Sequence, residues 1–295
     1  VEGLSRTNPL KAARGGLKAL TATRTAQKIL RDVRPDAVMG GGGYVAGPVG
    51  LAAVLLRIPL VLTEADSHLG IANRLLAPFA RRVCLAFPLA GRTGPRYLVT
   101  GRPVPPPASD RDAARARFGL AEDDTVVLVF GGSLGARSIN QAAVAAFADA
   151  PFRVLHAAGA RDFPQLAAPG PRYDLREYIH EGFGDALLAS DLVVARSGGS
   201  IFEVAAHGRP AILIPYPTAA ADHQTANARW MEEAGAAIVI PDAELTAERL
   251  AHEVGELLHD RARLTAMAHA SAALARPDAA REIAAELLAA AGRAG

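Results

Sequence analysis

The stretch Val126-Val-Leu-Val-Phe-Gly-Gly-Ser-Leu-Gly-Ala-Arg137 joins a short apolar run to a glycine-rich turn that opens a helix-like segment. A run of this length, rich in branched residues, is typical of a buried parallel strand. Glycine after the strand permits the tight turn into a helix. The same order recurs elsewhere in the chain, which predicts an α/β protein with doubly wound parallel sheets.

Seven runs are short, apolar and mostly followed by glycine or proline, as expected of buried strands. They are Ala37–Met39, Leu60–Thr63, Arg82–Ala86, Val126–Phe130, Arg153–His156, Leu192–Ala195 and Ala211–Pro215. The proline-rich stretch Gly101–Pro107 suits neither a helix nor a central strand and predicts a linker.

We therefore expect two Rossmann-like domains, residues 1–104 and 105–280, and a C-terminal helix over 281–295 that can pack back on the first domain. Ser109 or Asp110 can cap the helix that opens the second domain. The first domain begins with a basic helix instead of a strand and glycine turn. We expect that it is incomplete, with at least one βα unit of roughly 30 residues or more preceding Val1.

Composition and charge indicate the compartment of the protein and the kind of partner that it binds. The 295 residues include one cysteine, Cys84, which permits no internal disulfide and favours a reducing cytosol. No apolar run reaches the roughly 18 residues that a membrane-spanning helix needs. The net charge is +2, yet residues 1–36 hold eight basic and three acidic side chains. A basic end on a near-neutral body indicates an anionic surface as partner, and we expect no nucleic-acid partner.

Three glycine-rich turns, Gly40–Pro48, Gly131–Arg137 and Arg196–Glu203, follow strands and precede helices. Glycine lets the backbone approach a ligand, and the next helix directs free N–H groups at an anion. Three such turns predict a diphosphate-bearing ligand in a cleft between the domains. None carries the Lys-Ser/Thr of a P-loop or the full dinucleotide spacing, which disfavours kinases and dehydrogenases.

Longer motifs around these turns resemble the MurG family of peptidoglycan enzymes. They are Gly41–Ala52, Val129–Asn140, Asp191–Ser200, Glu203–Pro217 and Asp222–Ala228. The resemblance implies a GT-B glycosyltransferase with two Rossmann-like domains facing across a cleft. It also implies an inverting transfer of N-acetylglucosamine from UDP-GlcNAc to a lipid-linked muramyl-peptide acceptor, the lipid I to lipid II step, with no metal and no cofactor.

The resemblance also implies site residues. Glu203 would hold the ribose hydroxyls, and turn residues such as Ser133 would meet the diphosphate. The expected donor set is Gly132, Ser133, Gly135, Arg137, Ile179, Arg196, Ser197, Gly198, Gly199, Ser200, Glu203, His223, Gln224 and Asn227. The expected acceptor set is Gly42, Gly43, Tyr44 and Gly47.

The chain departs from the family pattern on the acceptor and interdomain side. The family usually reads His-Glu-Gln-Asn where this chain has Thr63-Glu-Ala-Asp66. Pro105 stands where the family usually has arginine, with Arg102 nearby. The candidates for the general base that accepts the proton of the acceptor hydroxyl are Glu64, Asp66 and His68. The first glycine loop, which we expect to precede Val1, is an equal candidate source of the base.

Several alternatives stay open. The chain can be a UDP-sugar glycosyltransferase or epimerase with a different acceptor, or a non-catalytic UDP-sugar-binding partner subunit. Asp110-Arg-Asp112 resembles a metal-binding Asp-x-Asp, although helix capping suits its place better. His156 is expected to be structural. His207, His252, His259 and His269 are expected on helix surfaces.

A lipid-linked acceptor would require peripheral attachment at the cytoplasmic face of the cell membrane. Lys11, Arg14 and Lys18 recur at helical spacing, and Arg24, Lys28 and Arg31 form a second set. Leu10, Leu17 and Leu20 can add an apolar contact. The alternative is a solvated basic helix face.

Overall fold

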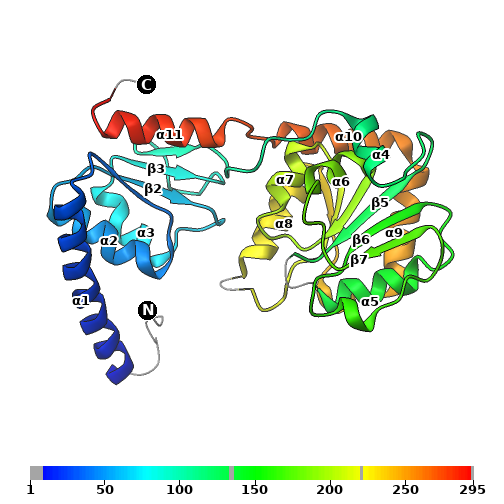
Figure 1. Cartoon of the computed structure of the whole chain (residues 1–295), viewed down its shortest axis with the longest axis horizontal. Coiled ribbons are helices and arrows are strands. Elements are labelled where there is room, and N and C mark those ends of the chain that lie inside the picture. Colours follow the sequence, from blue (N-terminus) through cyan, green and yellow to red (C-terminus); the bar gives the residue numbers. More distant parts are fainter. Residues whose placement is uncertain (1–8, 133–135, 220–221, 294–295) are drawn as a thin grey trace. The chain divides into compact units, whose positions relative to one another are not determined.

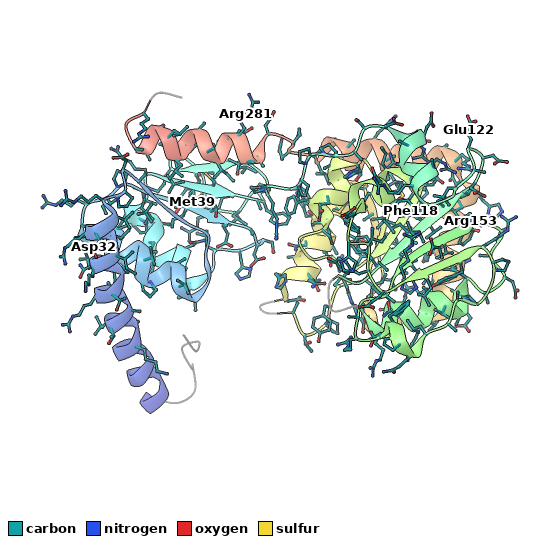
Figure 2. All side chains as sticks on the ribbon, in the orientation of Figure 1. Asp32, Met39, Phe118, Glu122, Arg153 and Arg281 are labelled. Atoms are coloured by element: carbon teal, nitrogen blue, oxygen red, sulfur yellow. The ribbon has the colours of Figure 1, made fainter. Side chains whose placement is uncertain are left out.

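The computed structural model describes residues 9–132, 136–219 and 222–293, and within these ranges every side chain except those of residues 9–17 and 44. The chain divides into two compact units (Figure 1). Unit 1 comprises Val1–Pro103 together with Asp278–Gly295, and unit 2 comprises Val104–Pro277. Charged side chains such as Arg281 in unit 1 and Glu122 in unit 2 lie on the outside of their units (Figure 2).

Unit 1 contains a parallel sheet with the strand order β1-β2-β3-β4. Its strands are β1 (Val38–Gly40), β2 (Leu60–Glu64), β3 (Arg82–Leu85) and β4 (Tyr97–Val99). Its helical elements are α1 (Pro9–Val33), α2 (Gly43–Leu55), α3 (Ile71–Leu76), the 3-10 turn η1 (Ala77–Phe79) and α11 (Ala279–Ala290). Helices α1 to α3 lie on one side of the sheet and α11 on the other (Figure 1).

The alternation along β2 explains this layering. Leu60 and Leu62 point into one core cluster, which they share with side chains of α1, α2 and α3. Val61 points the other way, where it meets Cys84 of β3 and Ile283 of α11. Successive strand residues face opposite sides, so the apolar run Leu60–Leu62 needs cover on both faces of the sheet.

Helix α11 returns from the far end of the sequence to supply that second cover. Two ion pairs hold it: Arg82 Nε lies 2.7 Å from Glu286 Oε2, and Arg293, which follows α11, pairs with Asp36 at 2.6 Å. Ile283 of α11 makes the apolar contact with the sheet, where it packs beside Cys84, which is 1% exposed. Burial raises the pKa of the Cys84 thiol to about 11.

Unit 2 contains a six-stranded parallel sheet with the order β10-β9-β8-β5-β6-β7. Its strands are β5 (Val126–Phe130), β6 (Arg153–Ala157), β7 (Tyr173–Arg176), β8 (Leu192–Ala195), β9 (Ala211–Leu213) and β10 (Ala237–Val239). Its helical elements are α4 (Arg111–Arg117), α5 (Arg137–Ala146), η2 (Phe163–Gln165), α6 (Phe183–Ala189), α7 (Ile201–Ala206), α8 (His223–Glu233), η4 (Asp242–Glu244), α9 (Ala247–His259) and α10 (Arg261–Ala273).

Strand β5 is the centre of unit 2, and all five of its residues are buried. Val127 and Val129 share a core cluster with Ile139 of α5 and Val254 of α9. The predicted helix cap after the linker is confirmed at Asp110, whose Oδ1 accepts the Ala113 N–H at 2.9 Å. This bond satisfies one of the free N–H groups of the first turn of α4.

We predict that Cys84 reports on the docking of α11. The native chain is expected to be unreactive toward a thiol reagent such as DTNB, because the thiol is buried and the thiolate is the reactive species. Ile283→Asp places a charge in the apolar contact, and we expect it to make the single thiol react before global unfolding.

Leu288→Asp is the matched control, because Leu288 lies on the same helix and is 43% exposed. It should leave Cys84 protected. Equal labelling of both variants, or none of Ile283→Asp, would contradict the packing of α11 over Cys84.

Candidate functional site

The strand order of unit 2 creates a point where the chain changes direction. From β5 the chain adds β6 and β7 on one side, and then β8, β9 and β10 on the other. The crossovers after β5 and β8 therefore leave in opposite directions and open a crevice at the carboxyl ends of these two strands, where open α/β sheets bind ligands. The turns after these strands are Gly131–Gly132 and Arg196–Ser200, two of the three predicted glycine turns.

The turn after β5 needs glycine at Gly132, whose φ of 88° is strained for other residues. Ser133 and Gly135, two of the expected diphosphate contacts, lie outside the described residues. Arg137 begins α5, with a guanidinium that is 57% exposed and lies 3.3 Å from Asp162 Oδ1. This places a cation at the end of the glycine turn.

Arg196 is the first residue after β8, and its guanidinium is directed into the protein. Nη1 donates to the carbonyls of Ile214 and Pro215, each at 3.1 Å, and to Asp242 Oδ1 at 2.6 Å. Nη2 donates to Ser138 Oγ at 2.8 Å. Arg196 therefore ties the turns after β8 and β9 to the start of α5 and to η4. Its predicted contact with the donor stays a prediction.

The rest of the β8 turn is joined to α8. Ser197 Oγ donates to the Gln224 carbonyl at 2.7 Å, and Asn227 Nδ2 donates to the Ser197 carbonyl at 3.0 Å. Gln224 Oε1 accepts the Tyr216 N–H at 3.0 Å, and its amide end lies near Gly198. The segment predicted to contact the sugar is thus held against Ser197 and Gly198, and Gly198 and Gly199 are half-buried.

Glu203 lies in the first turn of α7, with a half-buried side chain. Its carbonyl accepts a 2.7 Å bond from Nδ1 of His207, and Nε2 of His207 accepts the Ala108 N–H at 3.1 Å. The expectation that His207 lies on a helix surface is therefore wrong, because both ring nitrogens are bonded to backbone groups and the residue is 8% exposed. Burial lowers the pKa of His207, and a ring nitrogen that accepts an N–H belongs to the neutral imidazole.

A row of hydrogen-bonded, buried polar side chains stabilises the start of α5. His156 contacts Tyr173 Oη through Nδ1 at 2.8 Å and Asn140 Oδ1 through Nε2 at 3.0 Å. Asn140 Nδ2 donates to Asp162 Oδ2 at 3.1 Å. Asp162 also accepts hydrogen bonds from Arg137 and Arg161. The hydrogen bond from Arg161 lowers the pKa of the Asp162 carboxyl. These hydrogen-bonded side chains hold the partly exposed guanidiniums of Arg137 and Arg161 beside the glycine turn.

Comparison with known families agrees with this arrangement. The glycosyltransferase family 28 N-terminal domain matches residues 1–85, and the C-terminal domain of the same family matches residues 126–283. The chain belongs to glycosyltransferase family 28.

Its relatives within family 28 include a protein of Rubrobacter xylanophilus named UDP-N-acetylglucosamine--N-acetylmuramyl-(pentapeptide) pyrophosphoryl-undecaprenol N-acetylglucosamine transferase. The two are 42% identical over 294 residues, which cover 97% of this chain and 86% of the relative. A relative of the same name from Moorella thermoacetica is 41% identical, with 95% and 80% covered.

Solved structures show that this family 28 chain has the GT-B fold. The crystal structure of Acinetobacter baumannii MurG matches with a TM-score of 0.78 at 31% identity, over 93% of this chain and 79% of that one. A Neisseria meningitidis UDP-GlcNAc 2-epimerase bound to UDP-GlcNAc matches with a TM-score of 0.66 at 16% identity, over 92% and 81%. At that identity the epimerase shares the fold alone.

Three donor candidates of unit 2 remain: Ile179 follows β7, Ser200 follows β8 and His223 begins α8. Ile179 is 5% exposed, and the rings of its neighbours Tyr178 and His180 pack together with centroids 4.9 Å apart. The sequence did not single out Ser138 or Asp242, because Arg196 reaches both only through the fold. Asp162 was missed because Arg137 and Asn140 lie more than 20 residues from it along the chain. Ser200, at the N-terminal boundary of α7, completes the β8 turn and is half-buried.

In unit 1 the candidate residues follow β1 and β2. Gly42 and Gly43 have φ of 79° and 76° and lead into α2, while Gly47 faces Ala72 of α3. The side chain of Tyr44 lies outside the described residues. Glu64 ends β2 and is 7% exposed, Asp66 is half-buried and His68 is exposed.

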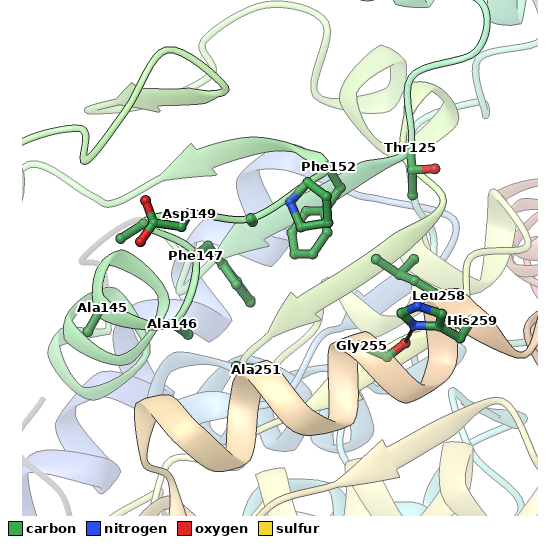
Figure 3. Close-up of a pocket in the computed structure, with 13 residues that line it drawn as sticks. Thr125, Ala145, Ala146, Phe147, Asp149, Phe152, Ala251, Gly255, Leu258 and His259 are labelled. Atoms are coloured by element: carbon green, nitrogen blue, oxygen red, sulfur yellow. Dashed lines mark hydrogen bonds between the residues drawn. The ribbon is translucent and has the colours of Figure 1, made fainter.

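A pocket of about 490 Å³ lies elsewhere in unit 2 (Figure 3). Phe147, Phe152, Leu258 and His259 are among the residues that line it. Thr125 and Phe152, which also line it, directly precede β5 and β6. The pocket is therefore at the amino ends of the strands, opposite the glycine turns, and is not part of the candidate donor site.

We predict that His156 makes unit 2 acid-sensitive. Burial lowers the pKa of His156 from 6.5 to about 4, so the unfolded state binds the proton more readily. The stability from the neutral ring is fully present above pH 6.5 and is lost as pH falls toward 4. The slope is up to about 1.4 kcal/mol per pH unit.

Urea unfolding followed by fluorescence of Trp230, the single tryptophan, measures this in unit 2. His156→Gln should lower stability at pH 7 and reduce the slope between pH 6.5 and 4. His180→Gln, at an exposed position, should keep the slope of the unaltered chain. An unchanged slope in His156→Gln would contradict the assignment.

Proposed function

We propose that this chain transfers N-acetylglucosamine from UDP-GlcNAc to an N-acetylmuramyl-(pentapeptide) pyrophosphoryl-undecaprenol acceptor. The observation that carries the proposal is the 42% identical relative with that activity in its name, aligned over 97% of this chain. The placement of two glycine turns at the β5–β8 crevice supports the donor half of the proposal, because such crevices bind diphosphate ligands.

The reaction is a single displacement. A hydroxyl of the acceptor attacks the anomeric carbon, the bond to the UDP oxygen breaks, and a general base takes the hydroxyl proton. Negative charge grows on the departing diphosphate. We propose that Arg137 and the backbone N–H groups at the start of α5 stabilise this charge, which their position after the glycine turn supports.

We predict that the chain binds UDP and that Glu203→Ala weakens this binding by about 1–3 kcal/mol, the usual loss for a charge-assisted hydrogen bond to a ribose hydroxyl. Calorimetry with UDP and UDP-GlcNAc measures the affinity. Glu248→Ala is the matched control, because Glu248 is a first-turn acid on α9 of the same unit. It should leave the affinity unchanged.

The transfer itself is measured with labelled UDP-GlcNAc and the lipid-linked acceptor, with and without EDTA. We expect product in both cases. No heat with UDP at millimolar concentration would overturn the donor site, and an unchanged affinity with lowered melting in Glu203→Ala would make Glu203 structural. Strict dependence on Mg²⁺ would redirect attention to Asp110 and Asp112.

We further propose that unit 1 docks on an anionic membrane at the cytoplasmic face. Ala26 and Leu30 of α1 are buried in the core of unit 1, while Arg24, Lys28 and Arg31 of the same helix are exposed. None of the described helices is long and apolar enough to cross a bilayer.

A second feature of unit 1 supports docking. Leu55 at the end of α2 and Phe79 in η1 are 58% and 63% exposed. Phe79 borders a hollow of about 280 Å³ whose lining includes Arg57 and Arg81. Apolar side chains flanked by arginines suit the interface of a bilayer with anionic headgroups.

We predict salt-sensitive binding to vesicles that contain anionic lipid. Each basic residue near such a surface contributes about 1 kcal/mol. Lys11/Arg14/Lys18→Glu and Phe79→Ser should each reduce co-sedimentation. Arg229/Arg263/Arg276→Glu makes the same charge change on unit 2 and should not. Equal binding to neutral vesicles, or none to anionic vesicles at low salt, would remove this surface.

A further inference from the structure

We infer that Glu64 is a positioning residue that fixes the loop after β2 and holds it against the glycine turn after β1, so that Asp66 and His68 are the side chains this loop presents to the acceptor. The inference deepens the proposed function and rests on it. It starts from the partners of one buried carboxylate.

The Glu64 carboxylate accepts three N–H groups from the loop and from α3. Oε2 accepts the Gly70 N–H at 2.8 Å and Asn73 Nδ2 at 2.9 Å. Oε1 accepts the Asp66 N–H at 3.3 Å. Two of these donors are backbone groups at the two ends of the segment 66–70, so the carboxylate closes this segment into a fixed loop and anchors the start of α3.

Asn73 extends the clamp to the neighbouring turn. Its Nδ2 also donates to the Thr63 carbonyl at 2.9 Å, and a Cβ on Gly42 would lie only 3.5 Å from the same nitrogen. Thr63 Oγ1 in turn lies 3.5 Å from the Gly40 carbonyl. These two hydrogen bonds connect α3 to the end of β2 and the end of β2 to the end of β1, and the Asn73 amide lies beside Gly42. They hold the two loops predicted to meet the acceptor next to each other.

The same contacts argue against Glu64 as the general base. A base must offer a lone pair within hydrogen-bond reach of the hydroxyl that it deprotonates. Glu64 is 7% exposed, and both of its oxygens face protein N–H groups. Within the described part of the chain, the Asp66 carboxylate and the His68 ring make no hydrogen bond or ion pair, and Asp66 sits directly in the clamped loop.

Loss of the clamp is expected to misplace the loop rather than to remove a reacting group. A displacement of about 1 Å at a reacting group can cost on the order of 100-fold in rate. For Glu64→Ala we expect a 10- to 100-fold lower kcat at every pH. The fall in kcat toward acid pH that reports protonation of the general base, the acid limb of the pH profile, should still be present. Glu64→Gln should recover part of the rate, since one amide oxygen can still accept the Gly70 N–H.

The decisive experiment pairs amide hydrogen exchange of the segment 65–70 with the pH profile of transfer. In Glu64→Ala and in Asn73→Ala we expect exchange at least tenfold faster in this segment, and the double variant should add little, because the two residues share one contact. UDP affinity should stay within twofold of the unaltered chain. Glu282→Gln, an exposed acid on α11 of unit 1, is the matched control and should change neither readout.

Three outcomes overturn the inference. They are unchanged exchange in Glu64→Ala, unchanged kcat despite fast exchange, and loss of the acid limb in Glu64→Gln while exchange stays slow, which would make Glu64 the base. Absence of transfer by the unaltered chain would instead refute the proposed function. The exchange data would still decide whether the clamp exists.

Discussion

At the carboxyl ends of β5 and β8 the chain leaves one sheet in opposite directions, and the candidate donor site depends on this reversal. The order β10-β9-β8-β5-β6-β7 leaves no crossover above the gap between these two strands, so their turns can approach a ligand. Gly132 permits the first turn through its positive φ. Arg196 then binds the second turn to the start of α5, which makes the crevice a fixed part of unit 2.

In each unit a buried charged side chain supplies hydrogen-bond partners to the backbone of a turn, and the charge is positive in unit 2 and negative in unit 1. In parallel sheets the turns after the strands carry backbone groups that need partners. In unit 2 the cation of Arg196 satisfies carbonyls of the β9 turn, and in unit 1 the anion of Glu64 satisfies N–H groups of the β2 loop. A hydrogen bond to a charged group contributes about 1.5–3 kcal/mol. Both residues are therefore structural before any substrate is considered.

The sequence predicted the central strands well and the edges poorly. All seven predicted runs contain strands, whereas β4, β7 and β10 were missed. Each missed strand lies at the edge of a sheet and is partly exposed. Two of the four residues of β7 are charged, and β4 and β10 are apolar runs of only three residues, which a sequence pattern does not separate from other short apolar segments. The glycine turns were recognisable because their signal is local. The partners of Arg196, Glu64 and His207 were not, because Asp242, Asn73 and Ala108 reach them only through the fold.

Unsatisfied polar atoms show where the two sites depart from ordinary packing. Among the described side chains, the buried atoms without a partner are Asn73 Oδ1, Asn227 Oδ1 and Ser271 Oγ. A buried acceptor without a donor costs about 1–3 kcal/mol. Ser271 lies on α10, but each asparagine uses its Nδ2 to hold a turn at the carboxyl edge of its sheet. Holding those turns therefore outweighs the cost of one unpaired oxygen in each unit, and departures from complete pairing are expected where function constrains the structure.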